Sequence, residues 1–169
     1  MLPKLSVDSG HGNPVRDMWD RLQGVPGGKY LFSRFVGIVA PYTATVHARV
    51  ETLEDGRSVV TMRDRPGLRN PFRSVHAVAL TNLAELTGNL AVSYGLADDA
   101  RFIVSGFDME FHAKARGLIT GRCEVDVPKT NDKCLIPVEV GLYDDSGQRV
   151  ATAILRTAIG PKKGQVSGA

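Results

Sequence analysis

The longest apolar pattern in the chain lies between residues 75 and 94. Its apolar residues recur in almost every direction around a helical wheel, and Glu85 is the single acidic residue among them. A surface helix has one apolar stripe and a charged opposite face, so this pattern predicts a helix that other elements cover on most sides. Asn70 or Ser74 suits its start and Gly95 its end. A carboxylate there is costly unless it is paired, hydrogen-bonded or exposed at a cavity, which makes Glu85 a candidate for chemistry.

Two shorter helical patterns precede this segment. Asn13-Pro14 suits the start of one, whose apolar residues recur at helical spacing as far as Leu22. The other covers residues 29–39 and ends before Pro41. These helices either cover a sheet edge or a substrate tunnel, or simply pack against the rest of the fold.

Alternating apolar and polar residues predict six strands. Residues 44–51 and 58–65 form the first two, joined by a hairpin turn at Asp55-Gly56. Four more follow the long helix, and a phase slip at Ser105-Gly106 in the first of them indicates a β-bulge. This order predicts an α+β fold in which a curved antiparallel sheet wraps the long helix. The later strands are expected near residues 102–111, 120–127, 136–142 and 149–159.

Composition limits the classes of function. The 169 residues predict a single domain with a loose leader at residues 1–12 and a flexible tail at 160–169. A net charge of +3 without a long basic run gives little support for a nucleic-acid partner. The N-terminus has no signal pattern, and the apolar run at residues 30–40 is too short to insert across a membrane. Cys123 and Cys134 have no metal-ligand spacing, which predicts free thiols in a reducing cytoplasm and no metal site.

The order of elements and three residues near the long helix resemble the hotdog fold. The closer resemblance is to the thioesterase superfamily of the phenylacetate-degradation type, in an uncharacterised branch, over about residues 42–159. The helices within residues 13–40 lie outside that common core. The superfamily has an Asn before the helix, a His-Gly six residues later and an acid nine residues after the His. Asn70, His76-Ala77 and Glu85 stand at these spacings.

Three positions depart from the pattern of the superfamily. Arg73 stands where a glycine usually follows the Asn, and Ala77 and Val78 replace the two glycines that usually follow the His. Ala77 keeps its backbone N–H, whereas the β-branched Val78 is expected to narrow an acyl slot.

The resemblance implies an acyl-CoA thioesterase that hydrolyses its substrate with water and needs neither a metal nor a cofactor. A helix N-terminus suits a developing oxyanion, so the N–H of Ala77 would polarise the carbonyl with help from the Asn70 amide. Glu85 would act as the general base for water or, alternatively, as the direct nucleophile. His76 and Glu85 are about 13 Å apart along one helix, so the resemblance implies sites shared across a homodimer, alone or within a dimer of dimers.

A basic segment leads into the proposed oxyanion loop. Arginine forks suit the phosphates of coenzyme A, although a solvated charged loop is an equal alternative. We expect substrate contacts from Arg63, Arg65, Arg69, Arg73, Phe72, Val78 and Asn82.

Each catalytic candidate has a structural alternative. His76 would then satisfy a backbone carbonyl, Asn70 would only cap the helix, and Glu85 would be a buried structural acid paired to an arginine or a hydroxyl. At the level of function, a non-catalytic acyl-CoA or lipid-binding protein is the alternative to a hydrolase. A hotdog dehydratase is a third hypothesis, but the proline-rich loop of that branch is absent from the sequence.

Overall fold

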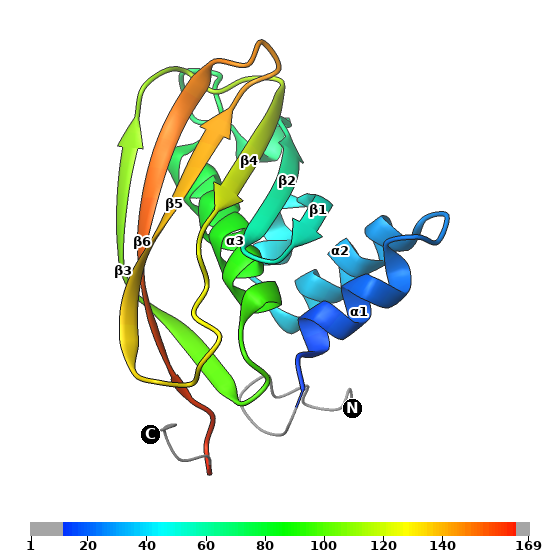
Figure 1. The fold of residues 1–169 in the computed structure, drawn as a ribbon. Coiled ribbons are helices and arrows are strands. Elements are labelled where there is room, and N and C mark those ends of the chain that lie inside the picture. Colours follow the sequence, from blue (N-terminus) through cyan, green and yellow to red (C-terminus); the bar gives the residue numbers. More distant parts are fainter. Residues whose placement is uncertain (1–11, 165–169) are drawn as a thin grey trace.

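A long helix lies in the hollow of one six-stranded antiparallel sheet (Figure 1). This computed structural model describes residues 12–164. The strand order is β1-β2-β4-β5-β6-β3. The helical elements are α1 (Pro14–Leu22), α2 (Gly28–Val39), η1 (Thr43–Val46), η2 (Pro66–Leu68) and α3 (Ala77–Gly95). The strands are β1 (Arg49–Glu54), β2 (Arg57–Arg63), β3 (Ala100–Phe111), β4 (Leu118–Glu124), β5 (Cys134–Tyr143) and β6 (Arg149–Pro161).

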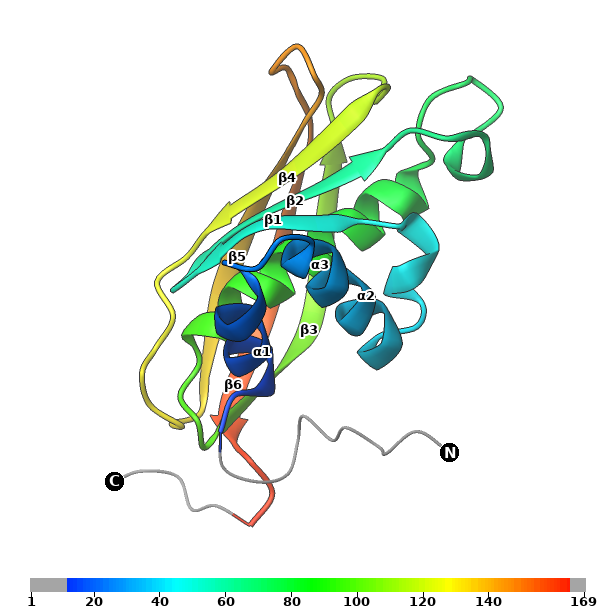
Figure 2. The same ribbon diagram turned by 90° about the vertical axis from the view of Figure 1, so that its right-hand side faces the viewer.

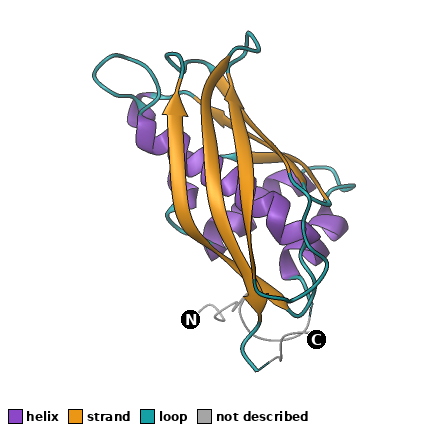
Figure 3. Ribbon diagram, turned by 60° about the vertical axis from the view of Figure 1, so that its left-hand side comes forward, coloured by secondary structure: helices purple, strands orange, loops and turns teal. Residues whose placement is uncertain are grey.

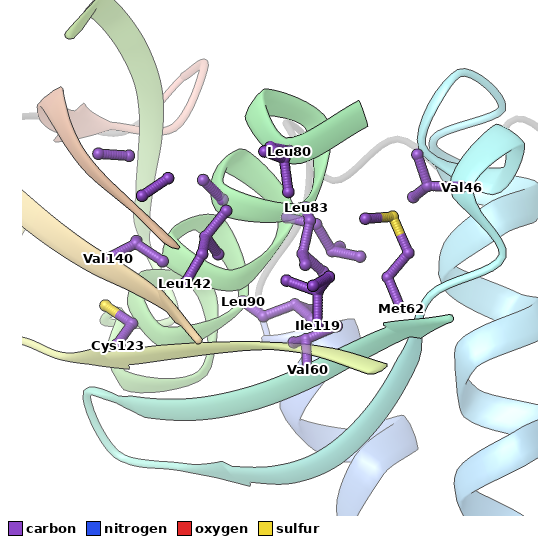
Figure 4. Packing of buried hydrophobic residues seen from close by; sticks show 14 of the residues in the cluster. Val46, Val60, Met62, Leu80, Leu83, Leu90, Ile119, Cys123, Val140 and Leu142 are labelled. Atoms are coloured by element: carbon purple, nitrogen blue, oxygen red, sulfur yellow. The ribbon is translucent and has the colours of Figure 1, made fainter. Parts of the chain in front are cut away.

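The helices all lie on one side of the sheet (Figure 3). On α3, the side chains of Leu83, Ala84, Ala91 and Val92 are fully buried, and they pack against the inward-facing residues of the strands (Figure 4). The pattern of the sequence therefore predicted the enclosure of this helix correctly. The α+β architecture, a curved sheet around a central helix, is the hotdog fold that the resemblance implied.

The two edges of the sheet differ in how they are covered. Helix α2 covers the β1 edge, where Ser33 Oγ accepts a hydrogen bond of 3.0 Å from the Val50 N–H and Lys29 Nζ donates one of 2.6 Å to the Glu51 carbonyl. At the other edge, β3 pairs with β6 alone and presents a twelve-residue strand with one unpaired side. The predicted bulge is present as a register shift between Val104 and Gly106.

The predicted starts of α3 and β1 are wrong. The N-cap of α3 is His76, not Asn70 or Ser74. Residues 44–48 alternate like a strand, but residues 43–46 form the 3-10 helix η1, and β1 begins only at Arg49. Thr45 Oγ1 donates to the Tyr42 carbonyl at 2.6 Å, and His47 has a left-handed backbone (φ 51°), so local hydrogen bonding and a reversal of chain direction replace extended pairing here.

The C-terminal strand is longer than predicted. β6 continues to Pro161, and the Lys162 N–H bonds the Asp99 carbonyl at 2.9 Å, so the segment expected to be a flexible tail begins as part of the sheet. Residues 1–11, the expected leader, and residues 165–169 lie outside the described part of the chain. None of the described helices is long and apolar enough to cross a bilayer.

Candidate active site

The loop before α3 and the end of β3 enclose a cavity of about 380 Å³ at the N-terminus of α3. Two parts of the chain meet in it, because the end of β3 passes beside the start of the helix. From the loop and the helix come Asn70, Phe72 and Ala77, and from the segment after β3 come His112 and Lys114. Three of the predicted site residues therefore line one cavity.

Asn70 holds the loop in shape. Its Oδ1 accepts hydrogen bonds from the backbone N–H groups of Phe72 at 3.0 Å and Ser74 at 3.2 Å, and its Nδ2 donates to Ser74 Oγ at 3.0 Å. Its backbone N–H also bonds the Ser74 carbonyl. An amide Nδ2 has two protons, so this bond leaves one donor of Asn70 for a ligand in the cavity.

The backbone of Arg73 has a conformation that favours glycine. Its φ is 58°, in the left-handed region that glycine adopts at little cost and other residues adopt at about 1 kcal/mol or more. The Arg116 side chain donates to the Arg73 carbonyl at 3.3 Å, which helps to hold this conformation. Arg73 therefore adopts a backbone conformation that a glycine at this position would adopt at lower cost.

His76 caps α3 through its ring. Its Nδ1 accepts a hydrogen bond of 3.1 Å from the Val78 N–H, so the proton of the neutral imidazole lies on Nε2. The structural alternative for His76 named a backbone carbonyl as its partner and is wrong in that respect, because the ring accepts a hydrogen bond from a backbone N–H instead. Ala77 is the first residue of the helix, and its N–H has no partner within residues 12–164, as expected for the first turn of a helix.

Glu85 lies on the open side of α3. The side chain of Glu85 is exposed, as is that of Val78 two turns earlier, and Thr81 between them is half-buried. The other sides of the helix face the sheet or the other helices. Glu85 is therefore not a paired acid in a filled core. About 12 Å along the helix axis separate it from Ala77, so the two groups of one protomer do not reach the same carbonyl.

The four arginines before α3 divide into two groups. Arg69 forms a two-pronged ion pair with Asp64, with Nε 2.8 Å from Oδ1, and this hydrogen bond raises the pKa of the guanidinium further above its usual value. Arg65 donates to the Thr45 carbonyl at 2.5 Å. Within the described chain, the side chains of Arg63 and Arg73 make no such bond and are exposed, so these two remain available to a phosphate.

Asn82 and Phe72 lie in contrasting environments. Asn82 is buried and its Nδ2 donates to the Tyr42 carbonyl at 3.2 Å, so it attaches η1 to α3; substrate contact by Asn82 stays a prediction. Phe72 is 73% exposed at the mouth of the cavity.

Two cavity residues were not among the sequence candidates. These are His112, whose Nε2 lies 2.8 Å from Thr152 Oγ1, and Lys114. No local signal marks either residue, because the segment after β3 reaches the cavity through a contact between distant parts of the chain, in which the Val75 N–H donates to the Ala115 carbonyl at 2.9 Å. Within residues 12–164, no cluster of His, Cys, Asp and Glu suits a metal ion.

Residues 28–159 match the family model described as domain of unknown function DUF4442. The chain belongs to the DUF4442 family. The matched region includes α2, so this helix is part of the DUF4442 domain and not an addition to it. No protein with a curated description matches the chain.

Several crystal structures have a fold similar to that of this chain. A structural genomics target is 27% identical with a TM-score of 0.75 and covers 87% of this chain and 98% of its own. A Pseudomonas aeruginosa protein of unknown function, described as a probable thioesterase, is 23% identical (TM-score 0.68; 81% and 97% covered). A Haemophilus influenzae thioesterase is 13% identical (TM-score 0.67; 80% and 92% covered). These similarities confirm the hotdog fold of the DUF4442 domain.

Proposed function

We propose that this protein hydrolyses acyl-CoA thioesters in the cytoplasm, at sites shared by two protomers. The proposal rests on Ala77, which lines a cavity at a helix N-terminus and whose N–H has no partner within residues 12–164. The positive end of the α3 dipole points in the same direction, so negative charge that develops on a thioester oxygen is stabilised there. The description of similar folds as thioesterases supports this reaction class.

The second half of the site comes from Glu85 of the partner subunit. Within one chain, the carboxylate is about 12 Å from the Ala77 N–H, which is too far for both to act on one carbonyl. β3 is the edge of the sheet opposite β1, and α2 packs at the β1 edge (Figure 2). Glu85 is exposed on α3. Antiparallel pairing of two β3 edges would place the open sides of both α3 helices against each other, in a two-fold dimer with two equal sites.

In the proposed reaction, the Glu85 carboxylate takes a proton from water as the oxygen of that water attacks the thioester carbon. The oxyanion is held by the N–H of Ala77 and by the free Nδ2 proton of Asn70. When the carbonyl re-forms, the carbon–sulfur bond breaks and the thiolate leaves. Arg63 and Arg73 are proposed to contact the phosphates of coenzyme A.

The sharpest test removes the oxyanion donor alone. Proline is well tolerated at the first residue of a helix, and His76 already has the extended backbone (φ −66°, ψ 142°) that precedes a proline. Ala77→Pro should therefore leave the thermal midpoint almost unchanged and lower kcat for thiol release by about 100-fold or more. Wild-type turnover in this variant would exclude the Ala77 N–H from the reaction.

The proposed base has its own matched pair of variants. Glu85→Gln should lower turnover at least ~100-fold, whereas Glu124→Gln, which alters another exposed carboxylate on β4, should not. If wild-type protein binds a panel of acyl-CoA substrates tightly and releases no thiol, the protein is a binding module and not a hydrolase.

A further inference from the structure

A second cavity of about 320 Å³ is lined by residues of α2, η1 and β1. Leu86 of α3 contributes to its wall, and Val36 and Val50 add apolar surface from α2 and β1. It shares none of its described lining residues with the cavity at the start of α3. Leu86 is also about 13 Å along the axis of α3 from Ala77, so a ligand here does not occupy the oxyanion site.

Basic side chains surround the polar part of this cavity. Arg34, His47 and Arg49 line it, and the described lining contains no acidic residue. Arg49 is engaged by Glu51, with Nε 3.2 Å from Oε1. Arg34 has no side-chain partner within residues 12–164 and is exposed, so one planar guanidinium fork is left for an anion.

From this combination we infer that the cavity binds a carboxylate with an unbranched apolar tail, of the fatty-acid class. The carboxylate pairs with Arg34 in the two-pronged geometry that guanidinium and carboxylate share, and the imidazole of His47 lies on the same cavity. The tail extends along Val36 and Val50 toward Leu86. A cavity of this size, mostly apolar with a few polar groups, is typical of a small-molecule site.

Close packing between α2 and η1 forms one wall of this second cavity. A Cβ built on Gly37 would be 3.0 Å from the Cβ of Ala44, so the two backbones nearly touch and both residues line the cavity. Ala44 is exposed, which allows a larger side chain there to reduce the space without disturbing the core.

The test is calorimetric titration of the full chain with straight-chain carboxylates from hexanoate to dodecanoate, and with the primary alcohols of equal length. Each added methylene should strengthen binding about 4-fold until the cavity is full. The alcohols should bind at least ~5-fold more weakly than the acids, and Arg34→Gln should remove that difference. Ala44→Leu should lower the chain length at which the gain stops.

Arg21→Gln is the matched control, since Arg21 is an exposed arginine at the end of α1 and does not line the cavity. It should bind the carboxylates as the wild type does. Equal affinity for acids and alcohols, an unchanged affinity in Arg34→Gln, or the absence of binding up to millimolar carboxylate would each overturn the inference. Because the readout is binding, the result does not depend on whether the protein hydrolyses thioesters.

Discussion

Replacing Gly121 with alanine should show how closely the central helix lies against the sheet. Gly121 is on the inward face of β4, where a Cβ would overlap the hydroxyl of Thr87 on α3 and lie 3.3 Å from Leu142 Cδ2. Thr87 is fully buried, its Oγ1 donates to the Leu83 carbonyl at 2.7 Å, and its carbonyl accepts a bond of 2.7 Å from Ser58 Oγ. The hydroxyl therefore has no free space into which to move.

The expected cost of Gly121→Ala is about 2–4 kcal/mol of unfolding free energy. Overpacking in a well-filled core contributes about 1–3 kcal/mol, and displacement of the Thr87 hydroxyl removes a buried hydrogen bond of about 1 kcal/mol. Thr87→Ala removes the overlapping atom. In that background the added methyl group should cost at least ~1 kcal/mol less, which gives a clear coupling energy in a double-mutant cycle.

Urea unfolding followed by far-ultraviolet circular dichroism measures all four proteins of the cycle. Additive effects of the two substitutions, within about 0.5 kcal/mol, would refute the close approach of α3 to β4 and with it the tight wrapping of the helix.

Two further predictions concern buried polar groups. Asn13 caps α1 through the Arg16 N–H at 3.1 Å and donates to the Ser93 carbonyl at 2.6 Å, so Asn13→Ala should cost about 2 kcal/mol in urea unfolding, and an unchanged midpoint would contradict these contacts. Burial raises the pKa of the Cys123 thiol to about 12. The unfolded thiol ionises near pH 8.5, so its contribution to stability is present below that pH and is lost as the pH rises toward 12. Between pH 8 and 10 the wild type should lose roughly 2 kcal/mol more than Cys123→Ala, and equal losses would show that the thiol is solvated.

The features that sequence predicted well are those encoded locally. The Asp55-Gly56 hairpin, the bulge near Gly106 and the end of α3 at Gly95 all depend on residues that are adjacent or within a few turns of one another. The start of α3 was missed because a histidine ring performs the capping that Asn or Ser usually performs. Residues 44–48 were misread because an alternating pattern this short does not distinguish a strand from a 3-10 turn.

The site depends on longer-range geometry. Helical periodicity shows that α3 is apolar in almost every direction, but the curvature of the sheet decides which narrow strip, including Glu85, remains open. Likewise, His112 and Lys114 enter the cavity beside Asn70 only because β3 returns past the start of the helix. The left-handed backbone of Arg73 could not be predicted from its residue type, because arginine rarely adopts that conformation.

Mixing two variants that are each expected to be inactive tests the proposed thioesterase site, shared by two protomers, most directly. Each homodimer of Ala77→Pro or Glu85→Gln lacks one half of both sites, whereas their heterodimer has one site with an intact N–H and an intact carboxylate. Co-refolding equal amounts should therefore restore about a quarter of the wild-type rate of thiol release from acyl-CoA, since half of the dimers are mixed and each has one working site. A mixture as inactive as its two components would contradict the account.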